Sequence, residues 1–366
     1  MKRCKKCILP ETFPNIDFDD EGICSYCNSY KEFQPKGEKH FLKYLEWAKK
    51  KKRKYDVLVP LSGGKDSTFI LYLSKKIYNL NVLAYTYDNG FLTEDALHNI
   101  KSAVTKLDVD HQMYRPPWET LKKLYQTSLL KSGELCSVCG IGIAHAYLKI
   151  SSDRKIPLIL TGSAPNEWAG INKEDIYDID RFKFIMRDRT IISKNSLDKF
   201  LIYPILNSFF TMLFRKYSFG KFGKVVSPFY YLNRVNEEEI ENILRTELNW
   251  RNDTGKKHFD CIAEPFTNYI REQRFGYSRS NYYFSNLIRC GEMTREEAIK
   301  ELGVIRPNKE PENTKELFNK LDISYEKLDE IKMIAPYKYE KHVNKLQKLK
   351  KMLPQKLFNK LSIIFR

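Results

Sequence analysis

An apolar segment that stops at a glycine-rich polar loop constrains the fold of this chain more than any other feature. Residues 56–67 read DVLVPLSGGKDS, so a run typical of a buried β-strand is followed at once by serine, two glycines, lysine, aspartate and serine. Such a strand–loop–helix junction presents backbone N–H groups, hydroxyls and a helix N-terminus to an anion. Glycine also lets the backbone approach a phosphate closely. The stretch therefore predicts a phosphate-binding loop after the first strand.

Apolar strand candidates alternate with helical stretches beyond this point. Strands are expected at 56–61, 81–87, 109–114, 157–161 and 225–230, with helices at about 66–78, 94–107, 118–131 and 140–152. This alternation predicts an α/β fold with a doubly wound, parallel, five-stranded sheet whose two faces are covered by helices. Ligands of such sheets bind at the carboxyl ends of the strands.

The chain divides into four expected regions. They are a Cys4 zinc-binding module at 1–37, the sheet domain at 38–235, a helical substrate or partner region at 236–330, and a basic amphipathic tail at 331–366. A basic, aromatic segment at 178–224 interrupts the sheet domain. It is expected to pack on the sheet or on another subunit, such as that of a homodimer, rather than to contact a membrane, because Pro204 and Asn207 interrupt its apolar run.

Charge and hydropathy narrow the functional class. The 366 residues are 42% hydrophobic and carry a net charge of +17, of which residues 331–366 contribute ten Lys or Arg against one Glu. That charge suits an anionic partner such as a nucleotide, a nucleotide-sugar, RNA or a membrane surface. Without a signal peptide or a spanning segment, a cytoplasmic location is expected. The tail is expected to be a solvated helix docked on the body, with peripheral membrane contact as the alternative.

Four cysteines near the start have the spacing of a structural metal site. The pattern is Cys-x2-Cys, sixteen residues, then Cys-x2-Cys, formed by Cys4, Cys7, Cys24 and Cys27. Each pair holds two sulfurs at the separation that a tetrahedral Zn²⁺ requires. Four protein ligands leave no open coordination position, so the predicted Zn²⁺ would be structural.

The glycine-rich loop differs from the Walker A loop, because it is shorter and contains an acidic residue. It resembles the SGGxDS loop of the PP-loop ATP pyrophosphatases, a superfamily that includes GMP synthetase, NAD synthetase, asparagine synthetase and the tRNA thiolation enzymes. Those proteins cleave ATP to AMP and pyrophosphate. The resemblance implies the same use of ATP here.

A second resemblance covers most of the chain. It rests on the cysteine pairs, the loop, and the segments CSVCG (136–140), TGSAPNEW (161–168), WRNDTGKKHFD (250–260) and LIRCGEMTREEA (287–298). Together they are similar to the N-acetyl sugar amidotransferase family of the WbpG type, which acts in bacterial lipopolysaccharide and O-antigen synthesis. That family converts the acetamido group of a nucleotide-activated sugar into an acetamidino group. Its ammonia comes from separate subunits resembling the glutaminase and cyclase of histidine biosynthesis, and no nucleic acid takes part.

The resemblance also assigns roles to residues. ATP and its pyrophosphate are expected to be bound by the loop and by residues after the second and fourth strands: Ser62, Gly63, Gly64, Lys65, Asp66, Ser67, Asp88, Gly162 and Asn166. The expected catalytic residues are Ser62, Lys65 and Asp66. Asp66 and Glu167 are the expected Mg²⁺ ligands.

Two groups of candidate residues also have simpler structural interpretations. Asp88 sits in YDNGF, where an Asp-Asn-Gly turn explains it equally. Lys256, Lys257 and His258 are expected to bind a substrate phosphate or carboxylate, although a basic cluster is often a solvated surface.

Cys136 and Cys139 support an alternative function. Some tRNA thiolation enzymes hold an iron–sulfur cluster with a Cys-x2-Cys pair and a distant cysteine, a role open here to Cys261 or Cys290. The pair could equally hold a second metal, complete a site with another group, or be buried thiols. A third hypothesis is a non-catalytic scaffold that binds zinc and nucleotide.

Overall fold

The core of the protein is one parallel sheet. The computed structural model describes residues 2–165, 179–187, 193–202, 204, 222–233, 235–253, 259–305 and 308–335. Within them the strand order is β3-β2-β1-β4-β5, and every pairing is parallel. The strands are β1 (Val57–Pro60), β2 (Val82–Tyr87), β3 (Asp110–Tyr114), β4 (Leu158–Leu160) and β5 (Lys224–Val226). The predicted fold class is confirmed.

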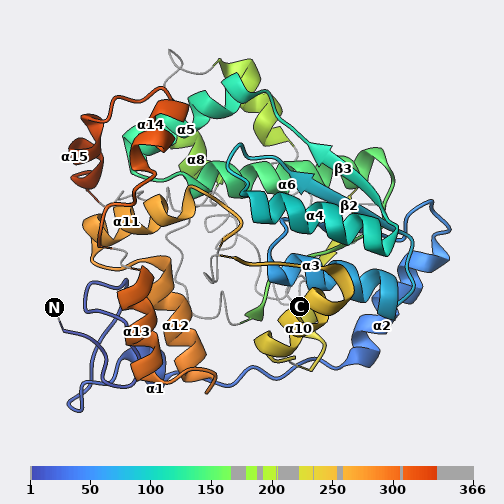
Figure 1. Cartoon of the computed structure of the whole chain (residues 1–366), viewed down its shortest axis with the longest axis horizontal. Helices are drawn as coiled ribbons and strands as arrows, with labels where there is room; N and C mark the ends of the chain where they lie inside the picture. Colours follow the sequence, from blue (N-terminus) through green and yellow to red (C-terminus); the bar gives the residue numbers. More distant parts are fainter. Residues whose placement is uncertain are drawn as a thin grey trace, which may run out of the picture.

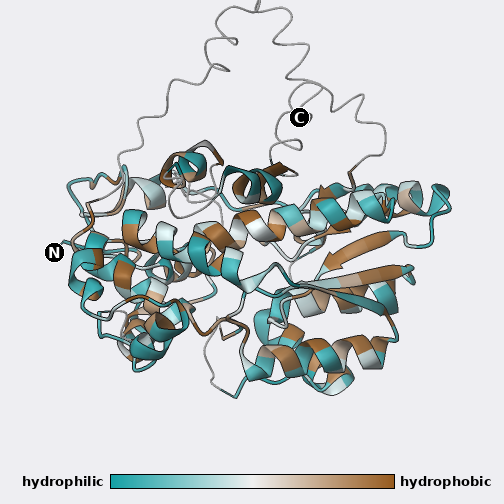
Figure 2. Ribbon diagram, turned by 90° about the horizontal axis from the view of Figure 1, so that it is seen from above, coloured by the Kyte–Doolittle hydropathy of each residue, from teal (hydrophilic) through white to brown (hydrophobic). Residues whose placement is uncertain are grey.

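Helices cover both faces of this sheet, which Figure 2 shows as an apolar layer between two helical layers. Successive strand residues point to opposite faces. Val57 and Val59 therefore join the core formed with one set of helices: α2 (Glu38–Lys50), α3 (Lys65–Tyr72), α4 (Glu94–Leu107) and α10 (Glu237–Leu248). Leu58 joins the other core, formed with α5 (Trp118–Ser132), α6 (Cys136–Asp153), α8 (Ile179–Ile185) and α11 (Glu264–Phe275).

Several predicted boundaries of strands and helices differ from those in the structure. The fifth strand ends at Val226, because Pro228 begins a 3-10 turn over Pro228–Tyr230. Helix α6 starts at Cys136 and so includes the Cys-x2-Cys pair, which the sequence placed before the helix. Helix α3 passes into a π-helical turn over Leu73–Ile77.

Helices α12 (Arg279–Arg289) and α13 (Arg295–Ile305) form one body with the N-terminal segment to the side of the sheet (Figure 1). The N-terminal segment, with its short helix α1 (Ser25–Asn28), packs there through Phe13, whose ring stacks on Tyr282, and through Ile8, which is buried against Phe284. The N-terminal segment therefore shares a core with α12 and α13, whereas α14 (Thr314–Lys320) and α15 (Lys327–Lys332) pack in the core that includes Leu58.

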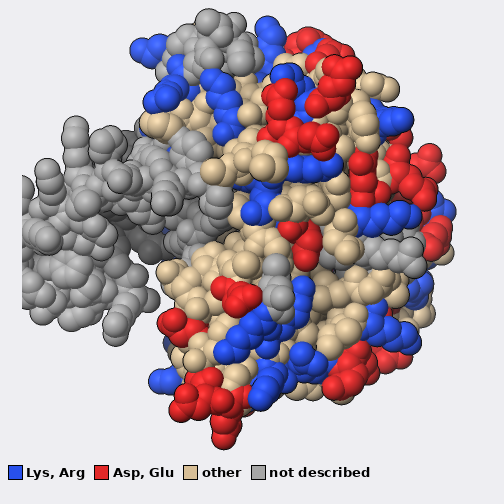
Figure 3. Space-filling model, turned by 90° about the vertical axis from the view of Figure 1, so that its left-hand side faces the viewer, with Lys and Arg blue, Asp and Glu red and all other residues tan. Residues whose placement is uncertain are grey.

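The inserted segment and the tail are described only in part. Helix α8 and residues 194–202 pack on the core that includes Leu58, so these portions of the insertion lie on the sheet domain as predicted. Residues 205–221 and the tail from 336 onward lie outside the described residues. No described helix has the length and apolarity needed to cross a bilayer. The face in Figure 3 carries acidic and basic side chains intermixed.

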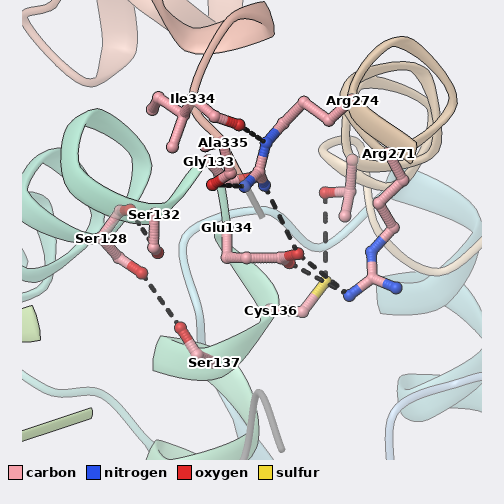
Figure 4. Close-up of polar contacts among 11 residues, drawn as sticks. Ser128, Ser132, Gly133, Glu134, Cys136, Ser137, Arg271, Arg274, Ile334 and Ala335 are labelled. Atoms are coloured by element: carbon pink, nitrogen blue, oxygen red, sulfur yellow. Dashed lines mark hydrogen bonds and ion pairs between the residues drawn. The ribbon is translucent and has the colours of Figure 1, made fainter. Parts of the chain in front are cut away.

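A buried ion-pair network joins the α5–α6 turn to α11 (Figure 4). Glu134 is 1% exposed and accepts hydrogen bonds from Arg271 Nη2 at 3.1 and 3.2 Å. Arg274 Nη1 lies 3.9 Å from the same carboxylate, and its Nε donates to the Ile334 carbonyl at 2.9 Å. One buried carboxylate thus contacts two guanidinium groups, and one of these, that of Arg274, also holds the chain beyond α15.

Glu134→Gln is expected to lower the free energy of unfolding by about 3–5 kcal/mol, because it removes the buried negative charge that both arginines contact. The measurement is urea denaturation at neutral pH. Glu330→Gln is the matched control: Glu330 pairs with Lys327 on the surface, where its side chain is 67% exposed. A surface pair contributes about 1 kcal/mol or less. Equal effects of the two variants would show that the network does not stabilise the fold.

Candidate functional site

The glycine-rich loop lies at the carboxyl end of β1 and opens directly into α3. Its two serines are joined, because Ser62 N donates to Ser67 Oγ at 3.2 Å and the two hydroxyl oxygens are 3.1 Å apart. The Gly64 carbonyl accepts hydrogen bonds from Ser67 Oγ at 3.1 Å and Thr68 Oγ1 at 2.8 Å. The loop is thus closed on itself around the first turn of the helix, where N–H groups face outward without intrahelical partners.

Gly63 holds the loop against α4 and the segment after α10. Its φ of +85° is a conformation that L side chains rarely adopt, and a Cβ at this position would lie 2.4 Å from the Ala96 carbonyl oxygen. The Gly63 carbonyl accepts from Asn99 Nδ2 at 3.1 Å and from Trp250 Nε1 at 3.0 Å. Only glycine fits at this position, and the two buried N–H donors fix the orientation of its peptide group.

Gly162 lies against the start of α3. A Cβ on Gly162 would stand 3.0 Å from both the Asp66 carbonyl carbon and the Ser67 nitrogen. The segment after β4 therefore passes directly beside the loop, as the prediction for Gly162 requires. Asn166 and Glu167, expected in the same segment, lie outside the described residues.

Charged groups surround the start of α3. Lys65 Nζ pairs with Glu237 Oε1 at 3.0 Å, and Tyr283 Oη on α12 donates to the same carboxylate oxygen at 2.7 Å. Burial raises the pKa of Asp66; Lys65 opposes this shift, whereas Glu237 and Asp260 add to it. A nearby cation would therefore stabilise the charged form of Asp66.

Asp260 is a site residue that the sequence did not single out. It ends the WRNDTGKKHFD segment, and its Oδ2 would lie 3.2 Å from a Cβ on Gly64. Burial raises its pKa, and a hydrogen bond with Ser62 opposes that rise. The signal was an acidic residue two positions after a basic cluster, in a segment that carried the family resemblance. Lys256, Lys257 and His258, which were singled out, lie outside the described residues.

Asp88 forms the turn that its sequence suggested. Its Oδ1 accepts from the Gly90 N–H at 3.0 Å, and its Oδ2 accepts from Arg115 Nε at 2.9 Å. The first bond closes an Asx turn after β2. A contact with the nucleoside stays a prediction.

The four N-terminal cysteines form a buried cluster. Their sulfurs all lie within 4.8 Å of one another, and the residues are 0–5% exposed. Hydrogen bonds from neighbouring thiols, that of Cys24 first, lower the pKa of Cys4 and bring that of Cys7 down to about 6. Such a group could hold a metal ion, and four sulfurs at this spacing suit a tetrahedral ion.

Two arginines of the C-terminal helices support this cluster. Arg289 Nη1 lies 4.0 Å from Cys27 Sγ, and Arg295 Nε donates to the carbonyls of Cys7 at 3.1 Å and Cys4 at 3.4 Å. Four thiolates and a divalent ion carry a net negative charge, which nearby guanidinium groups offset. The cysteine cluster is thereby tied to α12 and α13.

The remaining cysteines separate into two places. Cys136, Cys139 and Cys261 lie near the loop end of the sheet, where burial raises the pKa of Cys139 to about 12. Cys290 instead ends α12, where its thiol donates to the Asn286 carbonyl at 2.8 Å and lies beside Tyr30. Of the two cysteines considered as partners of the Cys-x2-Cys pair, the structure brings only Cys261 to it.

Comparison with known families finds a match over the C-terminal part of the chain. Residues 254–353 match the family model described as LPS biosynthesis protein WbpG-like, C-terminal domain. This region begins just after Trp250 and contains Asp260 and helices α11 to α15. The predicted resemblance to the WbpG type is confirmed over this region.

Similarity to individual proteins is more distant. Uncharacterized protein MJ1599 of Methanocaldococcus jannaschii is 24% identical over 164 residues, which are 44% of this chain and 58% of that protein. Among solved structures, the U34-tRNA thiolase NcsA of Methanococcus maripaludis with its [4Fe-4S] cluster has a TM-score of 0.38 and 15% identity, over 86% of this chain and 91% of its own. NMN synthetase of Francisella tularensis has a TM-score of 0.37 and 11% identity, over 76% and 98%. Scores this low carry no functional argument.

Gly63→Ala is expected to destabilise the protein more than Gly291→Ala. Both glycines have positive φ, +85° and +76°, but a Cβ on Gly291 meets nothing within 4 Å. The control therefore measures the backbone strain alone, about 1–2 kcal/mol, and the excess for Gly63→Ala measures the clash with Ala96. Chemical denaturation of both variants tests this, and equal losses would contradict the close packing of the loop.

Proposed function

We propose, from the match of residues 254–353 to the WbpG-like family model, that the protein is an ATP-dependent N-acetyl sugar amidotransferase. It adenylates the acetamido oxygen of a nucleotide-activated sugar and replaces that oxygen with ammonia, releasing AMP and pyrophosphate. The product is an acetamidino sugar for a bacterial surface polysaccharide such as lipopolysaccharide.

The position of Asp260 carries this proposal. Asp260 belongs to the WbpG-like domain, yet its carboxylate lies against Ser62 and Gly64 of the glycine-rich loop. Tyr283 of the same domain reaches the loop through Glu237, which pairs with Lys65. The family-specific region thus forms one wall of the phosphate site, where an acceptor must meet the α-phosphorus of ATP.

The loop supplies what pyrophosphate departure requires. The donors for the departing phosphates are the hydroxyls of Ser62 and Ser67, the N–H groups at the start of α3 and the Lys65 ammonium. When ATP binds, the Lys65 ammonium leaves the Glu237 carboxylate and pairs with a phosphate. The charge of Asp260 helps to raise the pKa of Asp66, so these two carboxylates fit a hard cation that prefers carboxylate oxygen. Mg²⁺ bound there would neutralise charge on the phosphates.

The chemistry balances with one ATP and one ammonia. The amide oxygen attacks the α-phosphorus, the bond to pyrophosphate breaks, and an O-adenylyl imidate forms. Ammonia then adds to the imidate carbon, the C–O bond breaks, and AMP leaves with the former amide oxygen. The amide needs this activation because its oxygen is otherwise a poor leaving group.

Ammonia is proposed to come from separate subunits, a glutaminase and a cyclase-like protein resembling those of histidine biosynthesis. The Cys4 cluster is proposed to hold a structural Zn²⁺, since its four ligands leave no open position. Its contacts with Arg289 and Arg295 would make metal loading part of the folding of the WbpG-like domain.

We expect AMP and pyrophosphate to form only when ATP, ammonium and an acetamido nucleotide-sugar are all present. Asp260→Asn should lower the rate on the order of a hundredfold or more, the usual cost of removing one group that positions or neutralises transition-state charge. Asp253→Asn is the matched control from the same segment, because its side chain is 69% exposed. Chromatography of nucleotides with mass spectrometry of the sugar gives both readouts.

Other outcomes would identify the alternatives. ADP formation, or AMP formation without any sugar, would contradict the proposal. AMP formation that depends on tRNA and a sulfur donor would favour tRNA thiolation. ATP binding without turnover under every condition would favour a non-catalytic scaffold.

A further inference from the structure

Glu237 holds the lysine of the glycine-rich loop. Lys65 Nζ lies 3.0 Å from Glu237 Oε1, and the two side chains are 14% and 29% exposed. Lys65 is the first residue of α3 and Glu237 is the first residue of α10, so the pair joins the starts of two helices. An ion pair that is partly withdrawn from water is stronger than a fully exposed one. Glu237 therefore competes with any phosphate for the Lys65 ammonium.

Tyr283 contacts the same carboxylate from α12. Its hydroxyl donates a hydrogen bond at 2.7 Å to Glu237 Oε1, the oxygen that also faces Lys65. A hydrogen bond to a charged group contributes more than one between neutral groups. Tyr283 thus orients the Glu237 carboxylate and stabilises its negative charge.

The packing of α12 fixes the position of Tyr283. Its ring packs against the core that contains Ile8 and Phe284, and the next helical residues include Ser285, whose Oγ accepts from the Ile8 N–H at 3.3 Å. Tyr283 also belongs to the region that matches the WbpG-like family model. This region therefore reaches Lys65 through a fixed hydroxyl and one carboxylate.

Negative charge is concentrated around the start of α3. Burial raises the pKa of Asp66, Lys65 lowers it, and Glu237 and Asp260 raise it further. When a phosphate takes the Lys65 ammonium, Glu237 stays behind beside these carboxylates and loses its cation. A hydrogen bond that remains on Glu237 reduces the cost of that change. Tyr283 therefore stabilises the arrangement in which Lys65 has moved to a phosphate.

We propose that Glu237 and Tyr283 are positioning residues that set the affinity of the loop for ATP, with opposite effects. Glu237 holds Lys65 back from the phosphates, whereas Tyr283 stabilises Glu237 after Lys65 has left it. The inference rests on the part of the proposed function that places ATP at the loop, and it does not depend on which acceptor receives the AMP. It gives the WbpG-like region a part in ATP binding through residues that do not touch a phosphate.

The first test measures the affinity of the full chain for the α,β-methylene analogue of ATP with Mg²⁺, by isothermal titration calorimetry without sugar or ammonium. The α–β linkage of this analogue resists cleavage. Glu237→Gln should bind it about fivefold more tightly, the factor that corresponds to one competing ion pair of about 1 kcal/mol. Glu238→Gln is the matched control and should bind like the wild type, because Glu238 is the exposed neighbour in the same helical turn.

Tyr283→Phe should instead weaken binding of the analogue about tenfold, because it removes one hydrogen bond to a charged group. Tyr325→Phe is the matched control and should bind like the wild type, since Tyr325 Oη donates to Glu310 Oε1 at 2.6 Å on the surface of the same region. In the Glu237→Gln background, Tyr283→Phe should have little further effect, because no carboxylate is left to stabilise. A purely structural role for Tyr283 would give the same loss in both backgrounds and would overturn the proposal.

Labelling of lysine amines gives a second readout that needs no nucleotide. Limited acetylation with acetic anhydride, followed by mass spectrometry, should modify Lys65 faster in Glu237→Gln than in the wild type or Glu238→Gln, because the ion pair shields the amine. Lys327, which pairs with Glu330 on the surface, should react equally in all three chains.

Three results would overturn the proposal: equal affinities of Glu237→Gln and the wild type, weaker binding by Glu237→Gln, or unchanged labelling of Lys65. A wild-type chain that does not bind the analogue would overturn it together with the placement of ATP at the loop. The opposite shifts in affinity are expected whether or not an acetamidino sugar forms. Failure of the amidotransferase proposal is therefore seen separately, in the sugar product.

Discussion

The structure of the candidate site depends on how the Gly63 peptide is held. Its carbonyl accepts hydrogen bonds from Asn99 on α4 and from Trp250 after α10, and its α-carbon lies against the Ala96 backbone. Buried hydrogen-bond donors and acceptors must be paired, so these contacts hold the loop in a single conformation. The rigid peptide fixes the loop N–H groups and the start of α3 before any ligand arrives, which is the condition for electrostatic stabilisation of charge that develops during reaction.

The same contacts bring distant parts of the chain to the loop. Trp250 begins the segment that ends at Asp260, so the pairing that orients Gly63 also sets the WbpG-like domain against Ser62. That domain is held in turn by the N-terminal cysteines through Arg289 and Arg295. A structural metal at one end of the molecule would thus support the acceptor side of the phosphate site.

The sequence predicted the parts of this structure that local patterns encode. Buried parallel strands read as short apolar runs, and a glycine-rich loop between strand and helix has few alternatives, so β1 to β4 and Ser62–Ser67 were found. The end of β5 was misjudged because Pro228 lies in an apolar run that looks continuous. The role of Asp260 was missed, and the choice between Cys261 and Cys290 was left open. Both depend on tertiary contacts between segments far apart in the chain.

The central proposal is that the acetamido oxygen attacks the α-phosphorus of ATP bound at the loop. Following a heavy-oxygen label placed in the acetamido group of the nucleotide-sugar tests this step most directly. If the amide is adenylated, the label must appear in the phosphate of AMP, one atom for each acetamidino sugar formed, with none in pyrophosphate. A label that stays in the sugar or appears in water while AMP is unlabelled would contradict the proposal.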